Sequence, residues 1–234
     1  MALAIVSTVG AGNSTSSTTV ATGATAHTAG NLLVAVVNWE NPATNCNSVT
    51  DTAGNTYTPL TKRTSTNIGA QMFYAKNITG HATNVVTATF STGTNGHSIL
   101  VHEFSGADLT APFTTGEEAG ASGANNPIDA GNVVTSVADS VLVAGFVRWN
   151  SGGVWTAGAD YAIGTNTNNI NSGYMPSMME YDIVAATGTY NGDATNTGGG
   201  EWLAVLAAFK GAAGGGTTWG ALLGLQNNRL VITT

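Results

Sequence analysis

The stretch NLLVAVVNW, residues 31–39, is apolar at almost every position. Successive side chains of a β-strand point to opposite faces of the sheet, so a strand with one solvated face alternates apolar and polar residues. Residues 32–37 do not alternate, which predicts a strand covered on both faces. The stretch SVLVAGFVRW, residues 140–149, has the same character. Two such strands are more apolar than a small sandwich with one solvated face requires.

The rest of the chain carries further strand signals and almost no helix signals. The segments are short, rich in β-branched or aromatic residues, and bounded by Gly, Asn, Asp or Pro. They are AQMFYAKNI (70–78), NVVTATFS (84–91), HSILVHEFS (97–105), MMEYDIVAA (178–186) and EWLAVLAAFK (201–210). The sequence therefore predicts an all-β chain.

Four short phrases recur in the same order about a hundred residues later, which indicates an internal duplication. They are AGNLLVA (29–35) and ADSVLVA (138–144), TAGNTY (52–57) and TAGADY (156–161), MFY (72–74) and MEY (179–181), and LVHEFSG (100–106) and VLAAFKG (205–211). We interpret TAG as a turn whose Gly takes a conformation costly for other residues, followed by a Tyr that leads into the next strand. Phe104 and Phe209 are expected at equivalent strand ends, with Leu100 and His102 on the same face as Phe104.

Two architectures fit the duplicated halves, which span about residues 1–108 and 109–212. They are either tandem immunoglobulin-like sandwiches or two Greek-key halves of one jelly-roll-like sandwich. We favour a single antiparallel β-sandwich domain over residues 1–212, because the connection from 107 to 136 has no obvious Pro-rich or charged linker.

Residues 213–234 form a Gly-rich linker followed by an apolar segment that lies outside both repeats. One interpretation is a final edge strand folded back on its own domain. The other is an assembly arm that docks on a neighbouring subunit by strand addition or tail exchange. Its apolar anchors would be Trp219, Leu222, Leu223, Leu225, Leu230, Val231 and Ile232.

The composition excludes several function classes. Only 8% of the 234 residues are charged and the formal net charge is −7, so no basic stripe is available for a nucleic acid. No apolar run is long enough for a membrane span. The N-terminus lacks a basic n-region, and we expect no signal peptide. A surface of hydroxyls and amides is common in extracellular and virion proteins, and a virion protein assembled in the host cytoplasm would combine these features.

A search for catalytic, cofactor-binding and metal-binding residues predicts none. No motif frames the four histidines, and Cys46, the single cysteine, has no nucleophile signature. Glu117 and Glu118 are interpreted as solvated loop charges. The possible calcium ligands Asp51, Asn55, Asp160, Asp182 and Asp193 lack the spacing of a calcium loop, and Asp51 is expected to cap its own turn. The histidines are His27, His81, His97 and His102, for which we expect structural or surface roles.

Glycan binding is the most plausible site chemistry. Trp39, Trp149 and Trp155 are expected at strand ends or in loops among polar residues, where an aromatic face could stack on a sugar. The alternative is a repeated core or rim role, since Trp39 and Trp149 would end equivalent strands.

Residues 28–110, and more loosely 136–211, resemble a β-sandwich module that recurs in phage structural proteins and in some bacterial surface and carbohydrate-binding proteins. The resemblance is carried by TAGNLLVAVVNW, VTDTAGNTYT, QMFYAKNI, VVTATFS and ILVHEFSGAD. It operates at the level of the fold and carries over no catalytic residue.

This resemblance implies a non-enzymatic virion structural protein, and we expect a capsid decoration or cement protein. It would act as a homo-oligomer, taken as a trimer, bound to a major capsid protein or another virion protein. The alternative is a glycan-binding module of a tail fibre or surface adhesin.

Overall fold

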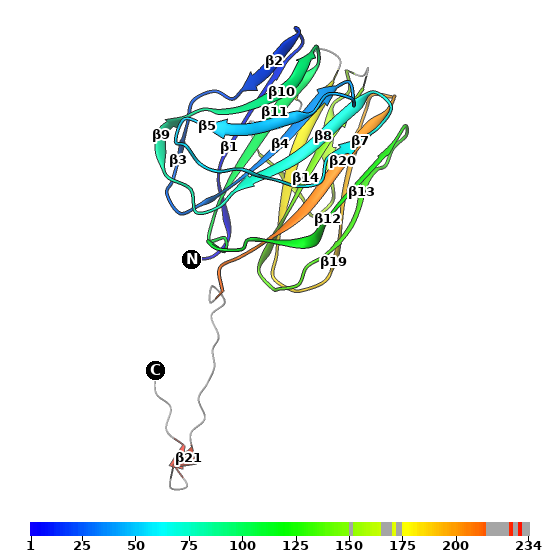
Figure 1. Ribbon diagram of the computed structural model, residues 1–234. Coiled ribbons are helices and arrows are strands. Elements are labelled where there is room, and N and C mark those ends of the chain that lie inside the picture. The colour runs from blue at the N-terminus through cyan, green and yellow to red at the C-terminus, as the bar shows by residue number, and fades with distance from the viewer. Residues whose placement is uncertain (150–151, 165–169, 172–174, 214–224, 227–228, 231–234) are drawn as a thin grey trace.

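The structure is a computed structural model that describes residues 1–149, 152–164, 170–171, 175–213, 225–226 and 229–230 (Figure 1). Every described element is a β-strand, and every described strand pair is antiparallel. This confirms the predicted all-β class. None of the described residues forms a helix that is long and apolar enough to cross a membrane.

The first half of the chain folds into a two-layer sandwich. Its larger sheet has the order β1-β11-β4-β8-β6, with β7 also paired to β8, and its smaller sheet has the order β2-β10-β5. The strands of the larger sheet are β1 (Ala4–Asn13), β4 (Leu32–Glu40), β6 (Thr58–Pro59), β7 (Arg63–Thr64), β8 (Ile68–Ala75) and β11 (His97–Ser105). The others are β2 (Ser17–Ala21), β5 (Cys46–Asp51), β10 (Val86–Thr94) and the separate pair β3 (Thr25–His27) and β9 (His81–Asn84).

The second half repeats this arrangement. Its larger sheet has the order β12-β20-β14-β18-β16, with β17 also paired to β18, and its smaller sheet has the order β13-β19-β15. The strands of the larger sheet are β12 (Phe113–Gly123), β14 (Ser140–Arg148), β16 (Ala162–Ile163), β17 (Ile170–Asn171), β18 (Pro176–Val184) and β20 (Trp202–Lys210). Those of the smaller sheet are β13 (Ile128–Val134), β15 (Trp155–Ala157) and β19 (Thr189–Asn196).

The strand pairs of each half are nested, as in a jelly roll. In the first half the first strand pairs with the last, β1 with β11, and the second with the one before last, β2 with β10. In the second half the corresponding pairs are β12 with β20 and β13 with β19. The structure therefore shows a jelly-roll-like β-sandwich with duplicated halves. Each half forms its own pair of sheets. This differs from our prediction that the two halves contribute strands to one shared sandwich.

The two larger sheets pack face to face, which makes four layers in all (Figure 1). Alternate residues of β4 enter different cores. Leu32, Val34 and Val36 lie in a central core between the two larger sheets. Leu33, Ala35, Val37 and Trp39 lie in the outer core of the first half. Strand β14 divides in the same way between the central core and the outer core of the second half. Burial on both faces is thus the reason why these two strands lack alternation.

Equivalent residues of the two halves meet in the central core. In the first half Val36 pairs with Leu100 and Met72. In the second half Gly145 holds the place of Val36, and it pairs with Val205 and Met179. A Cβ atom added to Gly145 would lie 2.5 Å from Cγ1 of Val36. The contacts between β8 and β20 are likewise mirrored by those between β18 and β11. The halves therefore pack about an approximate twofold axis, like the subunits of an isologous dimer.

The repeated TAG phrase precedes equivalent strands, but its glycines differ. Tyr57 leads into β6 and Tyr161 into β16, whose first residues pair with Tyr74 and Tyr181 respectively. Gly54 has φ +77°, as the turn interpretation requires. Gly158 does not adopt a positive φ, so the prediction is wrong for the second turn. A Cβ atom at Gly158 would lie 2.5 Å from the carbonyl oxygen of Asp193, and close approach of two backbones is the reason for glycine there.

The prediction that residues 1–212 form a single domain stays a prediction.

Candidate functional site

The tryptophans expected to stack on a glycan are mostly internal. Trp39 is 0% exposed and donates from Nε1 to the carbonyl oxygen of Thr44 at 2.9 Å. Trp155 is 2% exposed and packs on Phe146, with ring centroids 5.9 Å apart. Stacking of a sugar on these two rings is incompatible with their burial. Trp149 is half-buried against the central core.

The prediction that Trp39 and Trp149 end equivalent strands is wrong by one residue. Trp39 pairs with His97, and the corresponding pair in the second half is Arg148 with Trp202. Arg148 therefore holds the place of Trp39, and Trp149 comes one residue later.

The predicted assembly arm is described only in part. β21 (Leu225–Gln226) pairs with β22 (Arg229–Leu230) in antiparallel register. The remaining anchors, Trp219, Leu222, Leu223, Val231 and Ile232, lie outside the described residues. Docking of the arm on a neighbour stays a prediction.

Three of the four histidines are buried, and burial lowers the pKa of each. His102 is 0% exposed in the central core, where desolvation lowers its pKa to about 3 and its ring meets that of Tyr181 edge-on at 5.7 Å. His27 and His97 bond to Asn84 and to the Thr94 carbonyl oxygen respectively. Burial raises the pKa of the Cys46 thiol to about 12, which keeps this thiol protonated. The three histidines and Cys46 are therefore part of the buried interior of the protein.

The buried and half-buried carboxylates accept hydrogen bonds that connect loops and strands. Asp51 accepts hydrogen bonds from Asn55, Tyr57 and Asn84. Burial alone would raise the pKa of Asp51, but these hydrogen bonds outweigh burial and lower it. Among the described residues, no group of three or more His, Cys, Asp or Glu is placed to hold a metal ion.

Glu117 and Glu118 lie in strand β12 rather than in a loop, so their side chains diverge. Glu117 accepts a hydrogen bond from the Ser136 amide at 2.7 Å, within its own half. Glu118 reaches across to the first half, where it accepts from the amide and the hydroxyl of Thr61 at 3.0 and 2.7 Å.

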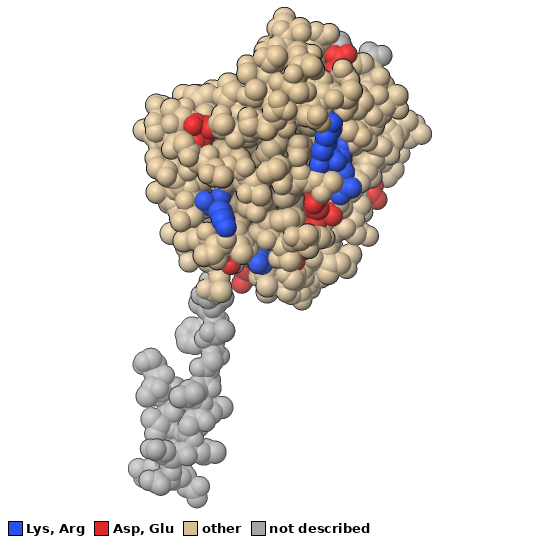
Figure 2. Space-filling view, viewed as in Figure 1, with Lys and Arg blue, Asp and Glu red and all other residues tan. Residues whose placement is uncertain are grey.

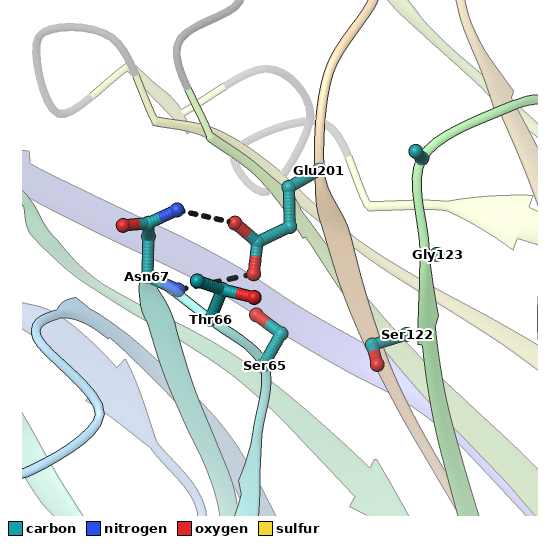
Figure 3. A pocket seen from close by; sticks show the side chains of 7 residues that line it. Ser65, Thr66, Asn67, Ser122, Gly123 and Glu201 are labelled. Carbon is teal, nitrogen blue, oxygen red and sulfur yellow. Dashed lines mark hydrogen bonds between the residues drawn. The ribbon is translucent and has the colours of Figure 1, made fainter.

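Three surface hollows lie along the seam between the halves, where the edges of the two larger sheets reach the surface. At the end of the molecule opposite the chain exit, Glu201 accepts from the amide and side chain of Asn67 at 3.0 and 2.6 Å (Figure 3). The hollow around this bridge has a volume of about 690 Å³. Its lining is small and polar, with Ser65, Thr66, Ser122, Gly123 and Ala124 beside the bridging pair.

Two further seam hollows are related by the approximate twofold axis. We call them the Tyr74 groove and the Tyr181 groove, and their volumes are about 470 and 430 Å³. The Tyr74 groove is lined by Thr58, Pro59, Leu60, Thr61, Tyr74, Phe113, Thr115 and Glu118. The Tyr181 groove is lined by Ile5, Val6, Ser7, Thr8, Thr25, Ile163, Gly164 and Tyr181. Each groove joins a short edge strand and a tyrosine of one half to the edge strand of the other half.

Exposed apolar side chains gather at the end where the chain leaves the second sandwich, which we call the exit pole. Met1 and Ile183, 87% and 38% exposed, line a small hollow with Gly211 and Ala212. Leu109 follows Asp108, whose amide donates to the Lys210 carbonyl oxygen. Val137 lies two residues before Asp139, whose carbonyl oxygen accepts from the Gly211 amide. Four of the seven exposed large apolar side chains among the described residues are therefore at this pole.

The surface around these features is sparsely charged. Figure 2 shows one face of the molecule on which Lys, Arg, Asp and Glu form small separate groups in an otherwise uncharged surface.

The chain matches no protein-family model and no curated protein.

Sequence reasoning missed Tyr74 and Phe113. The MFY phrase marked Tyr74 as part of the repeat, but nothing in the sequence placed it beside Phe113 of the other half.

Proposed function

We propose that this protein is a non-enzymatic structural protein of a phage virion, a capsid decoration or cement protein that assembles through its exit pole. The observation that carries the proposal is the gathering of exposed apolar side chains where the chain leaves the second sandwich. Exposed Met1, Leu109, Val137 and Ile183 surround the point at which the chain continues into the apolar segment 219–232.

The four-layer block suits a role in a lattice. A β-sandwich stabilised by three cores gives a rigid body, and its sparsely charged surface can approach neighbours without strong charge repulsion. Figure 1 places the N-terminus beside the end of β20, so both ends of the block face the same way.

The mechanism would be binding by repeated weak contacts. The arm would bury its apolar anchors on a second copy or on a major capsid protein, and many such contacts across a lattice would add through multivalency. The virion location, the trimer and the lattice partner belong to this proposal.

Deletion of residues 213–234 tests the proposal. We expect the truncated protein to keep its far-UV circular dichroism spectrum and its melting temperature. By light scattering, its mass should fall from that of an oligomer to that of a monomer, and its binding to particles should weaken. An unchanged oligomer with unchanged particle binding contradicts the proposal.

A pair of point variants separates the exit pole from the arm itself. Ile183→Ser removes an apolar side chain at the pole, and Val154→Ser removes one that is 55% exposed near the other end of β20. We expect Ile183→Ser to weaken assembly and Val154→Ser to leave it unchanged. Equal effects of the two variants contradict a role for the pole.

A further inference from the structure

The Tyr74 groove is a concave site that both halves build together. The first half supplies the short strand β6, Thr61 and Tyr74, and the second half supplies Phe113, Thr115 and Glu118 from β12. Its volume of about 470 Å³ lies within the range of about 300–1,000 Å³ that is usual for small-molecule sites. The groove therefore exists only when the two sandwiches are packed together.

An aromatic platform forms one wall of this groove. Tyr74 and Phe113 are half-buried, with ring centroids 5.9 Å apart. Both rings pack against the fully buried ring of Phe209, at 5.5 and 5.9 Å. Because Phe209 supports them from the core, their outer parts form a preorganised apolar surface. Rings held in this way lose little conformational entropy when a ligand stacks on them.

Polar groups border the platform. Glu118 is held in place by the amide and hydroxyl of Thr61, and each of its carboxylate oxygens has a further lone pair that can accept a hydrogen bond. Thr58 and Thr115, which also line the groove, each carry a hydroxyl group. A sugar ring offers an apolar C–H face and a rim of hydroxyls, which matches an aromatic surface bordered by such groups.

The charge of the groove limits the class of sugar. Its lining residues contain the carboxylate of Glu118 and neither Lys nor Arg. A sulfated or uronic acid sugar would therefore meet like charge among the lining residues, since the Arg63 side chain lies farther along β12, against Gly120.

The Tyr181 groove provides an internal comparison. Tyr181 packs on Phe104 at 5.6 Å, as Tyr74 packs on Phe209 at 5.5 Å. Ile5 pairs with Phe104 where Phe113 pairs with Phe209, so the second ring of the platform is replaced by an aliphatic chain. The described lining of the Tyr181 groove also contains no carboxylate.

We propose that the Tyr74 groove binds a neutral oligosaccharide, which stacks on Tyr74 and Phe113 and hydrogen-bonds to Glu118. The equivalent Tyr181 groove does not bind it. This inference is independent of the assembly proposed above, because the residues that line the groove include none of the arm and none of the exposed apolar residues of the exit pole.

Saturation-transfer NMR and calorimetry on the full-length protein test the inference. The probes are maltohexaose, mannohexaose, galactohexaose and the hexamer of N-acetylglucosamine, with heparin as the anionic reference. We expect at least one neutral probe to bind at concentrations up to about 10 mM, and heparin not to bind. Tyr74→Ala should weaken this binding by about tenfold or more, which corresponds to the loss of one buried ring contact.

Tyr181→Ala is the matched control, because it removes an equivalent contact with a core phenylalanine and should leave binding unchanged. Phe113→Ile places in the Tyr74 groove the residue type that Ile5 provides in the Tyr181 groove. Glu118→Gln removes the negative charge at nearly constant side-chain size. Both should weaken binding, and they keep the test valid if Tyr74→Ala does not fold. The inference is overturned if no neutral probe binds, if Tyr74→Ala and Tyr181→Ala weaken binding equally, or if Phe113→Ile and Glu118→Gln both leave binding unchanged.

Discussion

The contact between Gly145 and Val36 is the most sensitive point of the central core. The two residues hold equivalent places in the two halves and meet near the approximate twofold axis. One of them must be small, because two larger side chains cannot occupy the same place between the sheets. We predict that Gly145→Ala destabilises the protein and that Val36→Ala partly reverses this effect.

The distances give the size of the effect. The new Cβ atom would lie 2.5 Å from Cγ1 and 2.8 Å from Cγ2 of Val36, whereas carbon atoms in contact normally lie about 3.5–4.0 Å apart. The two sheets would have to separate by about 1 Å, or Val36 would have to leave its rotamer. Overpacking of this kind costs about 1–3 kcal/mol. Each kcal/mol lowers the melting temperature of a chain of this size by about 2–4 °C.

Urea and thermal unfolding of four variants measure the coupling. Val36→Ala alone should cost about 2 kcal/mol or more, through lost burial and the cavity that remains. The double variant adds one methyl group where it removes two, so it should be more stable than the sum of the single changes by about 1–2 kcal/mol. Gly23→Ala is the control, because a Cβ atom at Gly23 meets nothing within 4 Å.

Two results would refute this reasoning. One is a stability of Gly145→Ala within about 0.5 kcal/mol of the unchanged protein, which is typical of surface substitutions. The other is strict additivity of the two changes, which would mean that the halves do not pack through this contact. A single unfolding transition would also support the prediction of one domain over residues 1–212, because the halves share the central core.

Two buried titratable groups make stability depend on pH in opposite directions. Burial raises the pKa of Glu180 to about 8, so the folded protein keeps a proton that the unfolded chain releases, and stability is lost as pH rises from about 4.5 to 8. Glu180→Gln should remove a penalty on the order of 5 kcal/mol at pH 9 and much less at pH 5, as measured by urea unfolding. Equal effects at both pH values would exclude a buried acid. Desolvation lowers the pKa of His102 to about 3, so stability is lost as pH falls from about 6.5 to 3. His102→Phe should reduce the loss of stability at acid pH by on the order of 5 kcal/mol, and a smaller dependence on pH should remain from His27 and His97. An unchanged loss at acid pH would contradict the burial of His102.

Several features follow from the sequence without the tertiary structure. The unbroken apolar run of residues 32–37 indicates a strand buried on both faces, since a strand with one solvated face would alternate. The recurring phrases predict equivalent strands in the two halves. The register confirms this, because Phe104 and Phe209 pair with Leu32 and Val141 at equivalent places.

Other features were decided only by the packing of the sheets. A period of two tells which side of a strand is apolar, but not which layer covers that side. Trp39 and Trp155 lie near strand ends, as expected, yet each is buried between the two sheets of its own half, which leaves no ring face for a sugar. Tyr74 and Phe113 are distant in sequence, and they form one platform only because the two halves pack about an approximate twofold axis. The local pattern thus determined the strands and their repetition, whereas the contact between the halves decided which side chains line the Tyr74 groove.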